Sequence, residues 1–298
     1  MTLLSPREVL RRQVYMPWAR IPTGRMVELP GRGSTYVTDT PGPNPHAPTV
    51  VLLHAVGCTG LLTWYPSIEA LARRYRVVTL DQRWHGRGIQ SPTFDLRDCA
   101  DDVTALMDVL GIDEAMIGGF SMGSIIAQRV WRQHPHRVSG LVLAATTDRF
   151  RQSASERVFH QGMELAMAGT RGVSRSRTLR RAAQAAAETV VQVPDEMRDW
   201  ALDEWRSTSP WAVAQAVAVL GRHHSRPWLH SIDVPTAVVV PTHDHVIPPK
   251  RQLAVARAIP GATIHDIPAG HACCVLEAEV FVPAFVEAVN TIHARTRR

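Results

Sequence analysis

The sequence predicts an α/β fold with a mostly parallel central sheet, flanking helices and one inserted helical segment. Three observations predict it. Short apolar runs rich in β-branched residues alternate with helical patterns from Thr49 to Ala144. The alternation stops near Asp148 and resumes at Thr236, and only helix signals lie between these points. Because a β-α-β rhythm implies parallel strands with helices on both faces, we expect one such domain with a helical insertion.

Pattern and length define the elements before the insertion. Runs that are apolar and too short for a helix predict buried strands. The expected strands are 26–29, 34–39, Thr49–His54, Arg76–Asp81, Ala115–Phe120 and Val138–Ala144, with a turn at Gly31 and Gly33 between the first two. Apolar residues at helical spacing predict helices over Phe94–Leu110 and Met122–His134, and Pro135 ends the second.

The insertion is expected to form a helical lid over residues 148–230, between two parts of a core domain, 1–147 and 231–298. Its helix boundaries follow from capping and breaking residues. These signals are the capping box Ser153-Ala154-Ser155-Glu156, the suitable stop at Gly169, the prolines Pro194 and Pro210 at first-turn positions, and Gly221 after the last helix.

Four elements complete the predicted core. They are the strands Thr236–Pro241 and Thr263–Ile267 and the helices Lys250–Ala258 and Glu277–His293. The last helix carries apolar residues at helical spacing, which predicts a face packed on the sheet. These residues are Phe281, Phe285, Ala288 and Ile292.

Composition argues against several function classes. The chain has 298 residues, of which 45% are hydrophobic and 20% charged, as in soluble globular proteins. The net charge of +6 is mostly arginine, much of it in Arg171–Arg181 and at Arg295, Arg297 and Arg298, without a nucleic-acid-binding motif. No apolar run is long enough to span a bilayer. We expect no nucleic-acid partner and no integral membrane association.

Cysteine usage and the N-terminal residues favour a cytoplasmic location. Residues 1–12 lack the basic-then-apolar layout of a secretory signal. No CxxC pair occurs, and two adjacent cysteines cannot close a relaxed disulfide. Reduced thiols are expected at Cys58, Cys99, Cys273 and Cys274, which fits a reducing compartment. The sequence carries no signal for an oligomeric state.

The pentapeptide Gly119-Phe120-Ser121-Met122-Gly123 is a G-x-S-x-G motif between a predicted strand and a predicted helix. In that context the glycines permit a tight turn that holds the serine hydroxyl above the sheet. The helix that follows presents free N–H groups and its positive dipole end to developing negative charge. Ser121 is therefore the candidate nucleophile.

A serine hydroxyl needs a neighbouring base to accept its proton. His271 is the candidate, because it follows the strand Thr263–Ile267 at the carboxyl edge of the sheet, where catalytic groups gather in open α/β folds. Other histidines lie in or beside the insertion or flank a helix end, and we expect surface or lid positions for them. They are His223, His224, His230, His134 and His136.

The imidazole in turn needs a carboxylate that fixes its tautomer. Asp244 follows the strand Thr236–Pro241 and gives the chain order Ser, Asp, His that this geometry favours. Asp148 is the rival acid, since it follows the strand after the serine motif. His243 and His245 flank Asp244, but no third metal ligand is evident near them in the sequence. We therefore expect no metal and no cofactor.

Several of these segments resemble the α/β-hydrolase superfamily, in its lid-bearing esterase, lactonase and C–C hydrolase branch. Besides the serine motif, the resemblance rests on 52–57, similar to an HG-x-G-like oxyanion loop, on 81–88, similar to D-x-R-G-H-G-x-S, and on Gly270-His271. It extends from about Thr49 to Ile292. The resemblance implies an oxyanion hole formed by the backbone N–H groups of Val56 and Met122.

Two residues depart from the family pattern. Ala55 and Trp84 stand where the family has glycine. If the first position requires a positive φ, alanine is strained there by ~1–2 kcal/mol and the oxyanion hole has a different shape. Asp81 and Arg83 in the second loop are expected to form a structural charged pair.

The reaction we expect is hydrolysis of a small-molecule carboxylic ester or lactone through an acyl-enzyme on Ser121. An acyltransferase, a C–C hydrolase and a cofactor-free haloperoxidase use the same side chains and remain alternatives. A non-catalytic ligand-binding protein is a further alternative, against which an intact Ser121, Asp244 and His271 argue. Trp64 and Trp205 are candidate substrate-binding residues, for which ordinary packing is an equal alternative.

Overall fold

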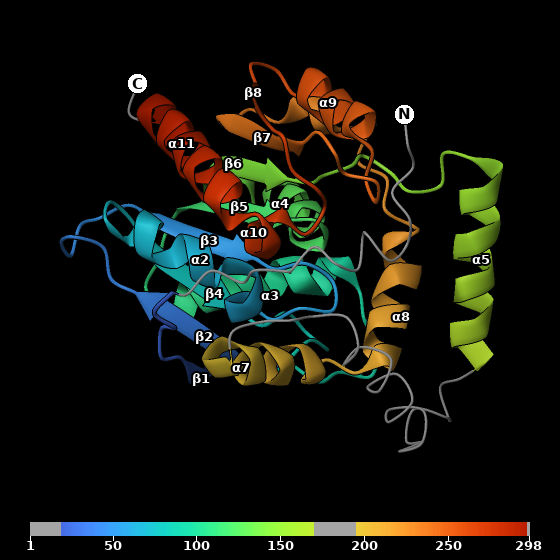
Figure 1. Cartoon of the computed structure of the whole chain (residues 1–298), viewed down its shortest axis with the longest axis horizontal. Helices are drawn as coiled ribbons and strands as arrows, with labels where there is room; N and C mark the ends of the chain where they lie inside the picture. The colour runs from blue at the N-terminus through green and yellow to red at the C-terminus, as the bar shows by residue number, and fades with distance from the viewer. Residues whose placement is uncertain (1–18, 170–194, 297–298) are drawn as a thin grey trace.

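The apolar runs form an eight-stranded sheet in the order β1-β2-β4-β3-β5-β6-β7-β8 (Figure 1). The structure is a computed structural model that describes residues 19–169 and 195–296. β1 pairs with β2 and β2 with β4 in antiparallel register, and the remaining pairs are parallel. The strands are β1 (Arg25–Leu29), β2 (Gly33–Thr40), β3 (Thr49–Leu53), β4 (Arg76–Leu80), β5 (Ala115–Phe120), β6 (Val138–Ala144), β7 (Thr236–Pro241) and β8 (Thr263–Ile267).

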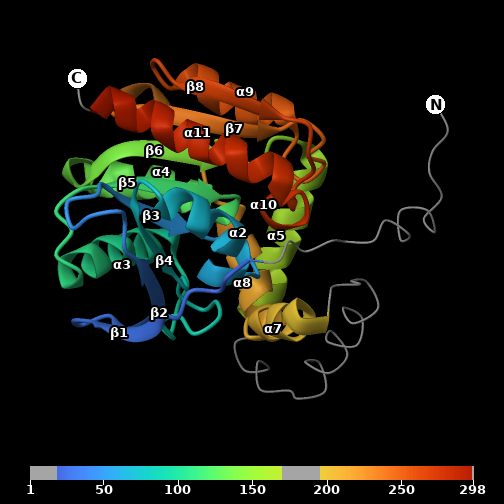
Figure 2. The ribbon, with the colours of Figure 1, turned by 60° about the vertical axis from the view of Figure 1, so that its left-hand side comes forward.

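Helices cover both faces of this sheet. On one face lie α2 (Gly60–Ala72), α10 (Cys273–Leu276) and α11 (Ala278–Thr296), and Figure 2 shows α2 and α11 in front of the strands. On the other face lie α3 (Leu96–Val109), α4 (Met122–Gln133) and α9 (Pro249–Ala258). The predicted fold class, a mostly parallel sheet between two helical layers, is confirmed.

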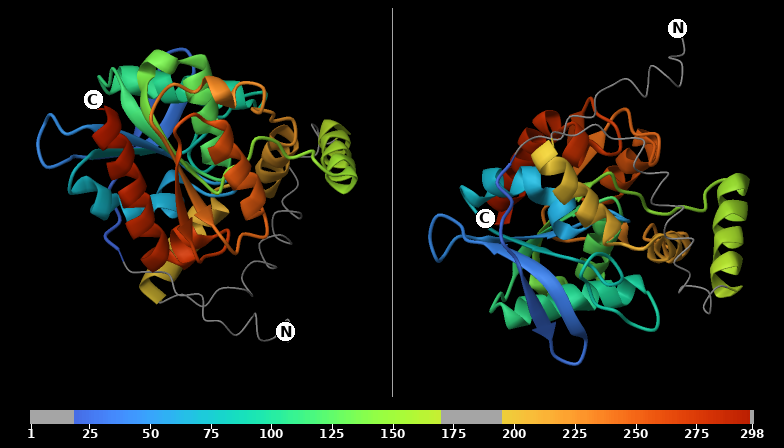
Figure 3. Two further views of the ribbon diagram at one scale, coloured as in Figure 1. Left: turned by 90° about the horizontal axis from the view of Figure 1, so that it is seen from above. Right: turned by 60° about the horizontal axis from the view of Figure 1, so that its bottom comes forward.

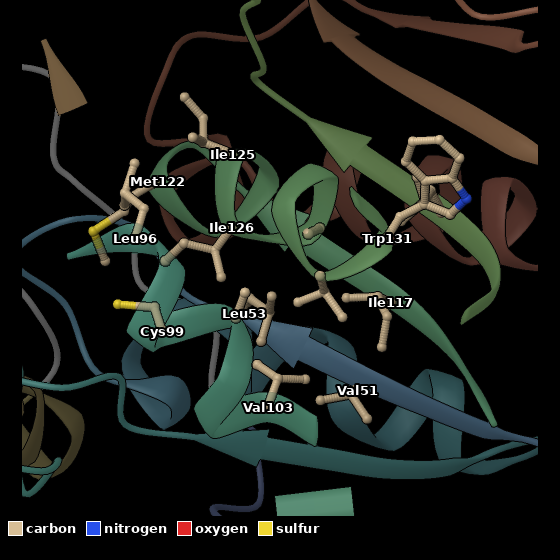
Figure 4. Packing of buried hydrophobic residues seen from close by; sticks show 14 of the residues in the cluster. Val51, Leu53, Leu96, Cys99, Val103, Ile117, Met122, Ile125, Ile126 and Trp131 are labelled. Carbon is tan, nitrogen blue, oxygen red and sulfur yellow. The ribbon is translucent and has the colours of Figure 1, made fainter. Parts of the chain in front are cut away.

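The two faces are built by alternate residues of the same strands. Side chains of a strand point alternately to opposite faces, so Met116 of β5 packs with α11 residues while Ile117 packs with α3 and α4. Figure 4 shows the second cluster, in which Val51 and Leu53 of β3 meet Val103 of α3. Strands buried on both faces are consistent with their continuous apolar sequence.

The sequence patterns missed two helices on the α11 face. α2 contains Pro66 and begins at Gly60, two residues that usually argue against a helix interior or start. Thr59 caps it, since its side chain accepts a hydrogen bond from the Leu62 N–H at 3.0 Å. α10 is a single short turn directly after His271, too short for a periodic pattern.

Between β6 and β7 the chain forms α5 (Ala154–Gly169), α7 (Asp195–Arg206) and α8 (Pro210–Leu220). The capping box is present, because Ser153 accepts from the Glu156 N–H and the Glu156 carboxylate accepts from the Ser153 N–H. α8 lies between α5 and the sheet (Figure 3). The basic segment Arg171–Arg181, together with Arg297, Arg298 and residues 1–12, lies outside the described residues.

Close backbone approach explains the glycines of the serine motif. A Cβ on Gly123 would overlap the Leu53 carbonyl of β3, and a Cβ on Gly119 would overlap the backbone of Gly123. The start of α4 is therefore pressed directly against the end of β3. Only glycine fits at both positions without moving backbone atoms.

We predict that Gly123→Ala destabilises the fold by about 1–3 kcal/mol or more, because the added methyl group meets backbone that cannot turn aside. The matched control is Gly162→Ala in α5, where a Cβ would have no neighbour within 4 Å. Alanine in an exposed helix is expected to be neutral or stabilising there. Calorimetric melting of both variants checks this, and equal melting temperatures would contradict the close approach.

Candidate active site

Ser121 occupies the turn between β5 and α4 with a backbone conformation that L-residues rarely adopt. Its φ is 52° and its ψ −115°, so the side chain leaves the strand direction at the carboxyl end of the sheet. The Ser121 N–H donates to the Ala144 carbonyl of β6 at 3.0 Å, which fixes the turn. Ser121 thus stands at the first turn of α4, as the sequence predicted, and its Oγ is free to face another element.

That element is the loop after β8, which carries His271. His271 Nε2 lies 3.2 Å from Ser121 Oγ, and His271 Nδ1 lies 2.7 Å from Asp244 Oδ2. An ionised carboxylate can only accept, so Nδ1 carries the ring proton and Nε2 is left to accept from the serine. The structure therefore brings Ser121, His271 and Asp244 together in one hydrogen-bonded series.

Asp244 is held rigidly behind the imidazole. Its side chain is fully buried. Oδ1 accepts the N–H groups of Val246 and Ile247, both at 2.8 Å, and Oδ2 accepts the Gln252 amide at 3.1 Å in addition to His271. Four donors on one buried carboxylate fix its orientation. Sequence reasoning missed Gln252, because no pattern marks a polar residue that turns inward from α9.

The loop that carries His271 is fixed from its own side. The Gly270 N–H donates to the Glu277 carboxylate at 2.7 Å, and the His243 N–H donates to the Ala269 carbonyl at 3.0 Å. The ring of Phe120 lies 5.7 Å from that of His271. His271 is thus tied to the loop that carries Asp244, and Glu277 is a second residue that the sequence patterns did not reveal.

Val56 and Met122, the expected oxyanion donors, lie on adjacent segments. Met122 begins α4, and Val56 lies in the loop between β3 and α2. The close packing of Gly123 on Leu53 and His54 brings this helix start beside that loop. Among the described non-glycine residues a positive φ occurs at Trp84, Ser121 and Ala145. Ala55 therefore does not have the strained, positive-φ backbone conformation. Gly57, with φ 77°, makes the bend instead.

A buried histidine joins this loop to the loop after β4. His54 Nδ1 donates to the Ala55 carbonyl at 2.7 Å, and His54 Nε2 accepts the Gln82 N–H at 2.8 Å. Burial lowers the pKa of His54 to about 4. The ring therefore stays neutral at physiological pH, which its accepting nitrogen requires.

The loop after β4 corrects one prediction. Asp81 and Arg83 do not pair with each other. Arg83 forms a bidentate ion pair with Asp102 of α3, at 2.7 and 2.8 Å. Asp81 instead accepts the backbone N–H groups of Gly60 and Arg87, both at 2.9 Å. Asp81 and Arg83 are two residues apart in a turning loop, and their side chains point in different directions. Their opposite charges therefore did not imply contact.

Trp84 keeps the backbone conformation expected of the glycine it replaces, with φ 67°. Its indole Nε1 donates to the Ser91 carbonyl at 2.9 Å, and the ring packs against Phe94 and against Trp211 of α8. A left-handed conformation costs a non-glycine residue ~1–2 kcal/mol. Burial of the large indole offsets that cost.

The two candidate substrate-binding tryptophans lie in different surroundings. Trp64 is fully buried and packs on Phe281 and Phe285 of α11, so it has no surface to offer a ligand. Of the two alternatives for Trp64, ordinary packing fits this position, because α2 turns the ring toward the α11 core. Trp205, near the end of α7, is 42% exposed to solvent.

The other acid and histidines considered lie apart from His271. Asp148 is buried near Gln152 and Arg226, so Asp244 is the carboxylate at the imidazole. His134 pairs with Asp101. His223 follows α8 in the inserted segment and is 3% exposed. The four cysteines are free.

The described residues lack both a metal-ligand cluster and a membrane-spanning helix. They contain no cluster of three or more His, Cys, Asp or Glu side chains that could hold a metal ion. No helix among them has the length and apolar character to cross a membrane.

The sequence is similar to those of known proteins. Residues 48–278 match a family described as the alpha/beta hydrolase fold. The chain is 26% identical to the pimeloyl-[acyl-carrier protein] methyl ester esterase of Chromobacterium violaceum over 246 residues, 82% of this chain and 95% of that protein. It is 35% identical to 3-oxoadipate enol-lactonase 1 of Acinetobacter baylyi over 96 residues, 32% of this chain.

The first curated relatives are matched over little more than a third of their length, 35% for that enol-lactonase and 38% for two others. Among solved structures, a hydrolase from Pseudomonas aeruginosa PA01 shares the fold with a TM-score of 0.72 at 22% identity, over 92% of this chain and 99% of that one. The chain therefore belongs to the alpha/beta hydrolase fold family.

Proposed function

We propose that this protein is a serine hydrolase that cleaves a small-molecule carboxylic ester or lactone. The observation that carries the proposal is the unbroken hydrogen-bonded series from Ser121 Oγ through His271 to Asp244. A hydroxyl with a base in reach, and a base with an orienting carboxylate behind it, is the arrangement that activates serine. Relatives named as an esterase and an enol-lactonase support the choice of an acyl substrate.

In the proposed reaction, Ser121 Oγ attacks the substrate carbonyl carbon while His271 Nε2 takes the hydroxyl proton. The carbonyl oxygen becomes an oxyanion and accepts the backbone N–H groups of Val56 and Met122. His271 then gives its proton to the leaving alcohol oxygen, which leaves an acyl-enzyme. Water, activated by the same imidazole, attacks the ester carbon and releases the acid and Ser121.

Electrostatics favours each step. Asp244 stabilises the imidazolium that forms twice in the cycle, and its four donors hold it in place. The Met122 N–H belongs to the N-terminal end of α4, where the helix dipole favours a developing oxyanion. Removal of one oxyanion donor typically costs ~2.7–4 kcal/mol in transition-state stabilisation.

We propose that residues 148–230 act as the lid, with 1–147 and 231–298 as the core domain. Contacts of the inserted helices with the loops around the site support this. Val213 of α8 lies against Gly57, the residue after Val56. Glu204 of α7 accepts hydrogen bonds from Thr59 and from Arg87, the latter at 2.7 Å.

We predict that Ser121→Ala lowers kcat/KM for p-nitrophenyl acetate by about three orders of magnitude or more, because the attacking oxygen is lost. Ser231→Ala is the control, since Ser231 is exposed and bonds only locally to the Trp228 carbonyl among the described residues. Circular dichroism would verify that both variants fold. Substantial esterase activity in Ser121→Ala would refute the proposed nucleophile.

Matched substitutions distinguish the two candidate acids, Asp244 and Asp148. Asp244→Asn should lower kcat by roughly 10³–10⁴-fold, because the amide favours the wrong imidazole tautomer. Asp148→Asn, a matched change at the rival acid, should leave kcat within a few-fold of the unmodified protein. Steady-state kinetics of both variants is the measurement, and a larger loss in Asp148→Asn would reverse the assignment.

A further inference from the structure

A cavity of about 340 Å³ lies where the N-terminal part of α3 meets α4 and the end of α8. Three arginines line it, one from each element or its end: Arg97, Arg129 and Arg222. His223 also lines the cavity, and Asp95 is the one carboxylate among the described lining residues. We call this the arginine cavity. Three guanidinium groups and one carboxylate therefore stand among the described residues that line it.

The Asp95 carboxylate already has a structural task. It caps α3 by accepting the Arg97 N–H at 2.8 Å. Arg129 Nε is buried and makes no hydrogen bond to the described residues. Burial and the neighbouring charge of Arg97 lower the pKa of Arg129. An arginine that is half-buried beside a like charge and short of acceptors is costly unless an anion joins it.

His223 presents the second unsatisfied group. Its side chain is 3% exposed. The Thr147 backbone lies near the His223 ring and slightly raises its pKa. Neither ring nitrogen makes a hydrogen bond of normal geometry to the described residues. Burial lowers the pKa of His223 to about 3, so the ring is neutral at pH 7 and its N–H is available as a donor. Such buried polar groups require a partner.

A second cavity of about 380 Å³ adjoins the first and shares Asp95, Val219 and Arg222 with it. Its lining includes three aromatic side chains, Trp84, Phe94 and Trp211. The rings of Trp84 and Trp211 lie 4.9 Å apart and join the core loop to α8. We call this the aromatic cavity. An apolar body placed there would lie next to the guanidinium groups.

We propose that these adjoining cavities bind an organic anion, with its carboxylate or phosphate-ester group in the arginine cavity and its apolar body in the aromatic cavity. Guanidinium groups bind both kinds of oxyanion through paired N–H donors. Ser121, His271, Asp244, Val56 and Met122 line neither cavity. The proposal therefore stands independently of the proposed esterase chemistry.

The test is calorimetric titration of the full chain with 4-phenylbutyrate at low salt. The neutral 4-phenyl-1-butanol, phenethyl phosphate and inorganic phosphate are titrated in parallel. We expect at least one of the two organic anions to bind at least tenfold more tightly than the alcohol and than inorganic phosphate. The tighter organic anion identifies the preferred oxyanion. Equal binding of acid and alcohol, or failure of both organic anions, would overturn the proposal.

Variants locate the binding. Arg129→Gln is expected to weaken the organic anion at least tenfold, and Arg222→Gln, at an exposed position, serves if the first variant does not fold. Arg132→Gln is the matched control, because Arg132 lies on the same helix over the Trp228 ring and outside the cavity. Ser121→Ala should bind unchanged. Unaltered affinity in Arg129→Gln and Arg222→Gln, or lost affinity in Ser121→Ala, would place the anion elsewhere.

Discussion

Ser121 can reach the imidazole of His271 only because β5 ends in a turn with positive φ that bends directly into α4. That turn exists because Gly119 and Gly123 let the helix start lie against the end of β3. The same approach places the Met122 N–H beside the loop that carries Val56. One steric constraint, the absence of two Cβ atoms, therefore positions both the hydroxyl and the proposed oxyanion donors.

The opposite side of the site depends on a buried carboxylate. Asp244 would be costly to bury alone, and its four donors remove that cost. They come from the backbone at Val246 and Ile247, from Gln252 of α9 and from His271. The imidazole is thus held by a carboxylate that has little freedom to rotate. Rigid support of this kind keeps reacting atoms within reach of one another.

How much could be predicted depended on the range of the interaction. Central strands such as Ala115–Phe120 are buried on both faces, so their apolar runs identified them. The carboxyl ends of β5, β7 and β8 indicated Ser121, Asp244 and His271, which lie together in the structure. The helix α2 was not predicted, because Pro66 interrupts its helical pattern. The burial of Trp64 and the partners of Asp81 and Arg83 could not be predicted, since they depend on how α2 and α3 are oriented against the sheet.

The order of the site residues along the chain has a consequence for biosynthesis. Ser121 and His271 are 150 residues apart, and a chain emerges from the ribosome N-terminal end first. A nascent polypeptide therefore exposes the hydroxyl long before β7, β8 and the imidazole exist. During that interval Ser121 lacks the base of the proposed triad. The nascent chain therefore does not yet carry the proposed hydrolase activity.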